Sequence, residues 1–191
     1  MREKIIQSAM RQIRRFGLRR FTIDDIVSDL AISKKTVYKY FKSKKEIIGS
    51  VVDLHHQMEI NNTLKALEIE GIWLDKLNAV IFCHTQSQVP DGLLEELQRY
   101  FPEEWKKNDA IAEFKSGQIK KLLSQGVLKG DVRPDINLGV LELALSKTIP
   151  ALFDYNFLKQ QDKSINQAME EFRDMLLYGI LKREEVRDDR A

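Results

Sequence analysis

The sequence predicts an all-α fold of about nine helices. Apolar residues recur every three to four positions in each long segment, which is the spacing that places them on one face of a helix. Serine or threonine stands directly before several of these segments, where a side-chain oxygen can accept a backbone N–H of the first turn. Neither an alternating strand pattern nor an internal repeat is present. With 191 residues and 43% apolar content, the chain can bury a substantial core.

The distribution of charge divides the chain into two parts. Residues 1–50 contain 13 Lys/Arg against 5 Asp/Glu, whereas residues 51–191 contain 18 against 24. The first part is therefore strongly basic and the second is acidic, which predicts that only the first part meets a polyanion. The single cysteine, Cys83, allows no intramolecular disulfide, and no apolar run approaches the length of a membrane span. We expect a cytoplasmic protein without membrane contact.

Residues 22–50 predict two short helices joined by a tight turn, with a third helix directly after them. Thr22 is placed to cap the first helix and Ser33 the second, because each precedes an apolar helical pattern. Residues 30–32 leave room only for a turn. The two helices must therefore cross steeply, as in a helix-turn-helix.

The second of these helices presents cations and hydroxyl groups. Val37, Tyr40 and Phe41 are expected to return to the core. A short helix with such an outer face suits the major groove of DNA, where Lys and Thr reach base edges. The side chains expected on its outer face are Lys34, Lys35, Thr36, Tyr38 and Lys39.

A capping box, Ser43 with Glu46, predicts the start of the following helix. The free N–H groups and positive dipole end of that helix lie beside Lys42 and Lys44 in the sequence. This corner is a predicted phosphate-binding site. Before the helix-turn-helix, residues 2–16 follow helical spacing, and Gly17 is placed to end that helix. Phe21 is expected in the small core of the basic N-terminal part, residues 1–50, which we call the head.

The run from Ile5 to Ile48 resembles the N-terminal domain of TetR-type one-component transcriptional regulators. In that family, helix 1 ends at a glycine and an aromatic residue precedes a capped helix 2. The family pattern S-K-x-T-x-Y-x-x-F, present here as SKKTVYKYF in residues 33–41, is followed by a Lys-bearing helix 4. Two positions depart from the pattern. Ala31 stands where the family often has Gly, which is tolerable if its φ is negative, and Lys35 stands where a small residue is common.

The resemblance implies a sequence-specific regulator, a repressor that a small-molecule effector releases from a palindromic operator in double-stranded DNA. Residues 1–46 would form the DNA-binding domain, and residues 47–191 the effector-binding and dimerisation domain. The base readers are expected among Lys34, Lys35, Thr36 and Lys39, the phosphate contacts are expected from Thr22, Tyr38, Lys42 and Lys44, and Ser33 belongs to the same site.

The second domain is predicted to consist of helices only. A long helix begins at Lys44 and continues into the sixties, which makes it the mechanical link between the two domains. Further helices are expected over residues 72–88, residues 93–101 with a stop at Pro102, and residues 103–125, with Gly126 and Gly130 marking a turn.

The last two predicted helices span residues 136–152 and 164–181. The first is apolar over most of its circumference, so it must be covered on more than one side. The second opens with a capping box formed by Ser164 and Gln167. The pair resembles the dimerisation helices of the same family, which form a four-helix bundle across a two-fold axis, and the alternative is that both only complete the core of one chain.

Aromatic side chains and a few polar ones in the second domain fit an effector cavity, because small-molecule pockets are mostly apolar with a handful of oriented polar groups. The same aromatic residues also suit an ordinary core, and the protein could be a dimeric DNA-binding module without an effector. We expect an apolar or amphipathic effector. Its candidate contacts are Asn62, Trp73, His84, Trp105, Phe114 and Gln118.

The sequence contains no pattern typical of an enzyme or a metal site. One cysteine and three histidines lack carboxylate partners at ligand spacing. Cys83 and His84 are neighbours on a predicted helix and point about 100° apart, which is poor geometry for a nucleophile and its base. No glycine-rich phosphate loop is present, and we expect no cofactor.

Overall fold

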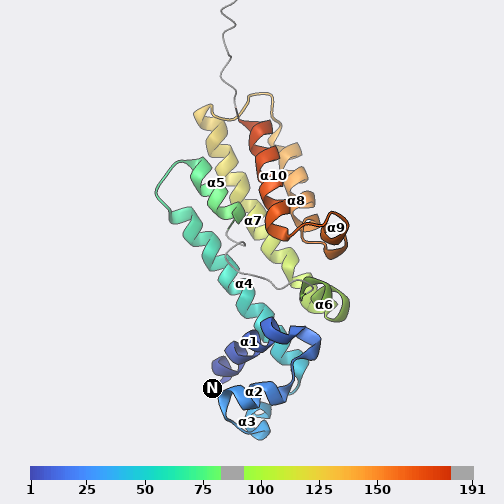
Figure 1. Cartoon of the computed structure of the whole chain (residues 1–191). Coiled ribbons are helices and arrows are strands. Elements are labelled where there is room, and N and C mark those ends of the chain that lie inside the picture. The colour runs from blue at the N-terminus through green and yellow to red at the C-terminus, as the bar shows by residue number, and fades with distance from the viewer. Residues whose placement is uncertain (83–92, 182–191) are drawn as a thin grey trace, which may run out of the picture. The chain divides into compact units, whose positions relative to one another are not determined.

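The computed structural model describes residues 1–82 and 93–181, and these residues form ten helices and no strand (Figure 1). The predicted all-α fold is confirmed. The helices are α1 (Arg2–Arg20), α2 (Ile23–Leu30), α3 (Lys34–Tyr38), α4 (Lys44–Glu68), α5 (Trp73–Phe82), α6 (Leu93–Tyr100), α7 (Pro102–Lys129), α8 (Leu138–Ala151), α9 (Tyr155–Gln160) and α10 (Ile165–Ile180).

The described residues divide into two compact units. The first contains residues 1–61 and 93–111, and the second contains residues 62–82 and 112–181. The long helices α4 and α7 therefore contribute to both units. The predicted boundary at residue 46 concerns the DNA-binding function and stays a prediction, whereas this division concerns packing.

The first unit has its own apolar core, to which α1, α2, α3, α4 and α6 contribute. Phe21, Ile26, Val37 and Ile48 are fully buried in it, and Phe41 is almost fully buried. The expected burial of Phe21 and Val37 is confirmed. Leu97 on α6 is buried in the same cluster, although it lies far along the chain from the head. The head is thus completed by a segment that the sequence places in the second half of the protein.

Gly17 was predicted to end the first helix, but it interrupts α1, which continues for a last turn to Arg20. Its φ of 85° lies in the region that favours glycine. Glu96 on α6 fills the space beside it, because a Cβ on Gly17 would lie 2.9 Å from the Glu96 carboxylate. That carboxylate accepts hydrogen bonds from the backbone N–H of Leu18, at 2.5 Å, and of Arg19, at 3.2 Å. Glu96 thereby caps the turn that the glycine starts.

A buried hydroxyl and an ion pair join α1 to α2. Ser8, fully buried on α1, donates a hydrogen bond to the Asp29 carboxylate at 2.6 Å. Arg11 donates to the same oxygen at 2.6 Å. Both hydrogen bonds favour the charged carboxylate, with the Ser8 bond the larger cause, and they lower the pKa of Asp29 below its ordinary value.

The turn between α2 and α3 contradicts one expectation. Ala31 has φ of 50° and ψ of 44°, so the condition that its φ is negative is not met. Its backbone N–H donates to the Val27 carbonyl and closes α2 with a left-handed residue. Alanine adopts this geometry only at a cost, because its Cβ crowds the backbone where glycine has none.

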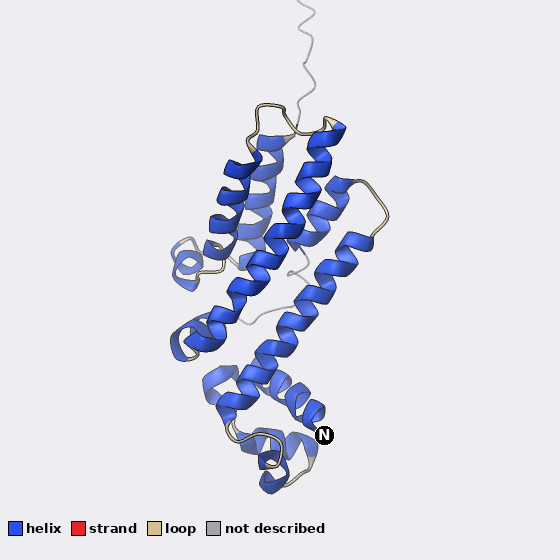
Figure 2. Cartoon of the chain, turned by 180° about the vertical axis from the view of Figure 1, so that it is seen from behind, coloured by secondary structure: helices blue, strands red, loops and turns tan. Residues whose placement is uncertain are grey.

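The second unit packs α5, α8 and α10 along the later part of α7 (Figures 1 and 2). Trp73 is buried in its core, and its indole N–H donates to the Asp131 carboxylate at 2.6 Å. Gly126 lies inside α7 rather than in the predicted turn. A Cβ there would lie 2.6 Å from the Trp73 ring, so the packing of that ring requires a glycine. The helix continues to Lys129, and Gly130, with φ of 76°, ends it.

The second unit contains a short helix, α9, that was not predicted, since six residues are too few to show a periodicity. The capping box of α10 is confirmed: Ser164 accepts from the Gln167 N–H, and the Gln167 side chain accepts from the Ser164 N–H. The predicted end of the helix over residues 72–88 lies outside the described residues. None of the described helices has the length and apolar character that a membrane crossing requires.

We predict that replacing Ala31 by Gly stabilises the protein by up to about 1 kcal/mol, because glycine relieves the left-handed strain and loses part of that gain to its freer unfolded chain. The matched control is Ala110→Gly at an exposed position inside α7, which should destabilise by a similar amount. Thermal melts followed by circular dichroism measure both. Equal destabilisation by the two variants would contradict the strain at Ala31.

We predict a pH-dependent effect of Asp29→Asn. Since the folded pKa of Asp29 is lowered, its stabilisation is fully present above the unfolded pKa and is lost as the pH falls through the folded value. The variant should melt below the wild type at pH 7, and the difference should shrink below about pH 4. The control is Asp109→Asn at an exposed position of the same unit. A difference that stays constant down to pH 2 would exclude this linkage.

Candidate nucleic-acid interface

Caps at both helix starts fix the geometry of the helix-turn-helix. The Thr22 hydroxyl accepts from the Asp25 N–H, and the Asp25 carboxylate accepts from the Thr22 N–H, which completes a capping box. Ser33 accepts from the Thr36 N–H at 3.1 Å. Both predicted caps are confirmed. Each uses a side chain to satisfy an N–H that the first helical turn leaves free.

The apolar side of α3 anchors it to the head. Val37 is fully buried, and Phe41, just beyond the helix, is 1% exposed. Tyr40 was expected in the core but is 42% exposed. The reason is that α3 ends at Tyr38, so Tyr40 lies in the turn that follows and does not continue the helical spacing.

The outer side of α3 carries the predicted DNA contacts. Lys34, Lys35, Tyr38 and Lys39 are exposed, and Thr36 is half-buried with its hydroxyl 3.0 Å from the Ser33 hydroxyl. The structure thus brings these predicted residues together on one small surface. We call the exposed side chains of residues 34–39 the reading surface.

Lys34 differs from the other lysines of this surface. Its ammonium group lies 2.9 Å from a carboxylate oxygen of Asp24 on α2. The hydrogen bond to Asp24 raises the pKa of Lys34 above its ordinary value. In the part of the chain that the structure describes, Lys35 and Lys39 form no ion pair with a carboxylate.

The start of α4 combines a backbone cap with a cluster of cations. The Ser43 hydroxyl accepts from the Glu46 N–H at 3.2 Å, as predicted. The Glu46 carboxylate accepts from the Lys42 N–H at 2.6 Å rather than from Ser43, so the box is shifted by one residue. Exposed Lys42 and half-buried Lys44 flank this helix start.

Lys44 already has partners inside the first unit. Its ammonium donates to the Arg19 carbonyl at 2.8 Å and lies 4.3 Å from the centre of the Phe21 ring. Desolvation by its surroundings lowers the pKa of Lys44. Its phosphate contact stays a prediction, and the structure assigns it an additional role at the end of α1.

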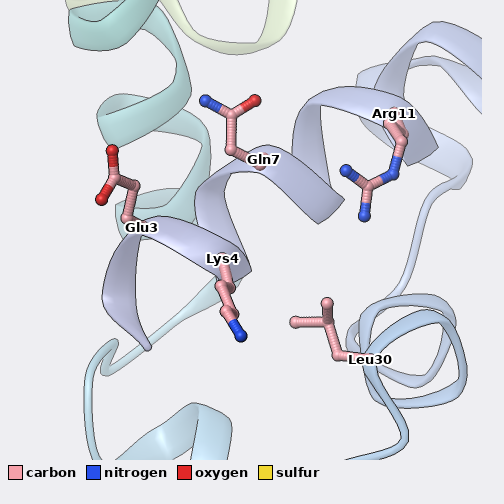
Figure 3. Close-up of a pocket in the computed structure, with 5 residues that line it drawn as sticks. All are labelled: Glu3, Lys4, Gln7, Arg11 and Leu30. Atoms are coloured by element: carbon pink, nitrogen blue, oxygen red, sulfur yellow. The ribbon is translucent and has the colours of Figure 1, made fainter.

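A surface cleft of about 420 Å³ lies beside α1 in the same unit (Figure 3). Glu3, Lys4, Gln7 and Arg11 line it from α1, and Leu30 lines it from the end of α2. Figure 3 shows the Lys4 and Arg11 side chains extending from α1 on the side where Leu30 lies. No sequence pattern indicates a site here, because the lining residues come from two helices.

The predicted effector contacts lie in both units. Trp105 packs against the core of the first unit, and Trp73 is buried in the core of the second. Asn62, Phe114 and Gln118 are half-buried residues of the second unit. His84 lies outside the described residues, so its predicted role is untested.

Sequence reasoning missed Asp24 and Glu96 at this interface. Neither residue was among the predicted site residues. The partners of both are fixed by the tertiary structure, since Lys34 lies on the next helix and the Glu96 contacts are 77 and 78 residues away. The sequence contains no signal that identifies them.

Comparison with known proteins agrees with this interface. Residues 5–51 match the family model of bacterial regulatory proteins of the tetR family. The chain is 24% identical over 190 residues to the uncharacterized HTH-type transcriptional regulator YvaF of Bacillus subtilis, and the match covers 97% of this chain and 98% of that protein.

Solved structures show the same fold over nearly the whole chain. A transcriptional regulator from Saccharomonospora viridis in complex with choline has a TM-score of 0.74 at 18% identity, covering 95% of this chain and 98% of that chain. FadR from Bacillus subtilis in complex with stearoyl-CoA has a TM-score of 0.65 at 18% identity, covering 94% and 100%. The chain thus carries the helix-turn-helix of bacterial regulatory proteins of the tetR family in residues 5–51, and it shares the fold of solved transcriptional regulators over nearly its whole length.

Proposed function

We propose that the protein is a cytoplasmic repressor that binds a palindromic DNA operator as a symmetric dimer. The observation that carries the proposal is the reading surface, where exposed lysines stand on a short helix with its apolar side anchored in the head. Such a helix reaches only a few base pairs, so a two-fold pair of heads doubles the sequence that is read. Repression, rather than activation, follows the family resemblance.

The contacts divide into two kinds in this proposal. Lys34, Lys35, Thr36 and Lys39 include the base readers. Thr22, Tyr38, Lys42 and Lys44 hold phosphates, which position the protein without reading sequence.

An exposed apolar face on α8 and α10 supports the proposed dimer. Val140 and Leu143 on α8 are 66% and 60% exposed, and Met175 and Tyr178 on α10 are 66% and 71% exposed. Each pair is spaced by three residues, which places its two side chains on one side of the helix. The two helices lie side by side in Figures 1 and 2. A second copy of the same face would cover these side chains and form a four-helix bundle.

We also propose a small-molecule effector of apolar or amphipathic character. The structural relatives named above were solved with choline and with stearoyl-CoA, which are cationic and amphipathic molecules respectively. Asn62, Phe114 and Gln118 are our favoured contacts, because they are half-buried and combine an aromatic ring with two amides. Trp73, His84 and Trp105 complete the candidate set.

Helix α4 is the proposed route by which the effector acts on DNA binding. It begins beside the phosphate corner at Lys44 and continues unbroken to Glu68, as the sequence predicts. An effector can shift the dimer between DNA-competent and incompetent states only through its different affinities for them. By reciprocity, operator DNA then weakens effector binding by the same factor.

We predict that Leu143→Glu disrupts the dimer, because it places a charge in an apolar interface. Sedimentation should show dimers of the wild type at micromolar concentration and monomers of the variant, with operator affinity reduced at least tenfold by loss of one head, on the order of 1.4 kcal/mol. The control is Lys159→Glu on the exposed surface of α9. A wild-type monomer that binds DNA with full affinity would overturn the proposed dimer.

We predict different effects for Lys42→Ala and Lys35→Ala on an operator selected from a random duplex library. Lys42→Ala should weaken all sequences alike and reduce the log–log salt slope by about one, since one phosphate contact is lost. Lys35→Ala should cost about 1–3 kcal/mol on the preferred site only. Fluorescence anisotropy over a range of salt concentrations measures both. A change of sequence preference in Lys42→Ala would show that the division of roles is wrong.

We predict that a panel of fatty acids, acyl-CoA esters and quaternary amines contains a compound that raises the melting temperature and weakens operator binding. Asn62→Leu and Gln118→Leu should reduce that thermal shift and keep operator affinity. If no compound of the panel shifts the melting temperature while the wild type binds its operator, the protein is a DNA-binding dimer without an effector of these classes.

A further inference from the structure

The Asp24–Lys34 pair places an acidic side chain next to the reading surface. Lys34 is the first residue of α3, and its ammonium lies 2.9 Å from the Asp24 carboxylate. Both side chains are largely exposed, so the pair contributes little to the stability of the fold. A carboxylate at such a surface also repels the phosphates of any DNA that approaches it. Asp24 also lies in the first turn of α2, where a negative charge favours the helix dipole, but neither that position nor its repulsion of phosphates requires the pairing with Lys34.

The neighbouring lysines differ from Lys34 in that they have no carboxylate partner within the described residues. Lys35, Lys39 and Lys42 are exposed, and within the described residues none of the three forms an ion pair with a carboxylate. A lysine ammonium without an ion pair is a mobile point charge, so besides a base edge it also reaches the phosphates of any sequence. Such pairs strengthen binding to all DNA alike and therefore lower the preference for one site.

We propose that Asp24 is a specificity-determining residue of the reading surface, which holds the Lys34 ammonium in place and keeps it from pairing with phosphates. An ammonium group has three N–H donors, and the bond to Asp24 uses one of them. The other two remain free for the acceptor edge of a base, such as O6 and N7 of guanine. This inference rests on the proposed DNA-binding function.

The arrangement lowers affinity for random DNA more than affinity for the operator. On random DNA the held ammonium finds no matching base, and the Asp24 carboxylate is repelled by the backbone. On the operator the ammonium meets its base with less rotational freedom left to lose, because the ion pair already restricts the side chain. Specificity is a difference of affinities, and here a repulsive group contributes to it.

The test compares Asp24→Asn, Lys34→Ala and the double variant with wild type, each titrated with a selected operator and a random 30-bp duplex at several salt concentrations. Asp24→Ser serves as a second variant at the same position. The control, Asp109→Asn, removes one negative charge from an exposed position of the same unit outside the helix-turn-helix. Failure of the wild type to bind either duplex in a salt-dependent way would contradict the proposed function itself.

We expect Asp24→Asn to bind the random duplex several-fold more tightly, with a log–log salt slope steeper by about one. The ratio of operator to random affinity should fall, and Asp24→Ser should behave alike. In the Lys34→Ala background, Asp24→Asn should change the slope less, because it removes only the repulsion of the carboxylate and releases no ammonium. The inference is overturned if Asp24→Asn keeps the wild-type ratio, if Asp109→Asn lowers the ratio equally, or if the slope changes as much without Lys34.

Discussion

Two apolar side chains hold the reading surface in place. Helix α3 has five residues, and a helix of that length is not stable alone, because its nucleation cost is not recovered by a few hydrogen bonds. Val37 and Phe41 supply the missing stability by burial in the core of the head. The lysines on the opposite side of α3 are therefore positioned by two buried residues. The phenylalanine that ends the pattern S-K-x-T-x-Y-x-x-F, here Phe41, has this physical reason.

The same core connects the head to a helix far away in the sequence. Leu97 of α6 is buried in the head cluster, and Glu96 caps the turn after Gly17. Arg19 in that turn donates to the Tyr100 hydroxyl at 3.1 Å, and its guanidinium lies over the Tyr100 ring. Apolar, polar and cation–π contacts of α6 thus meet at one point of α1. Any displacement of α6 would have to break the cap or carry the end of α1 with it.

Local chemistry was predictable from the sequence, and tertiary partners were not. The caps at Thr22, Ser33 and Ser164 could be predicted because a capping side chain and the backbone N–H that it bonds lie only three residues apart in the sequence. The prediction that Gly126 lies in a turn was wrong. A glycine is required there because a Cβ would clash with the ring of Trp73, which lies on another helix. The left-handed conformation of Ala31 could not be predicted either, because the turn imposes it against the intrinsic preference of alanine.

The candidate sites follow the same division. The reading surface could be predicted because one short segment supplies it, and the anchor residue Val37 follows from helical spacing. The predicted effector contacts come from several helices, and the sequence could not show which of them are used for packing. Trp73 is an example, since its buried ring fits against Gly126 and its N–H is bonded to Asp131.

Amide hydrogen exchange of the first unit tests most directly whether burial of Val37 and Phe41 holds α3. The Val37 and Phe41 N–H groups donate to the carbonyls of Ser33 and Val37 within the α3 segment. We expect both amides to exchange with the same protection as the buried amide of Ile26, and to lose it together in a Val37→Ala variant. Exchange of both amides at the rate of an unfolded peptide in the wild type, with Ile26 protected, would contradict this account.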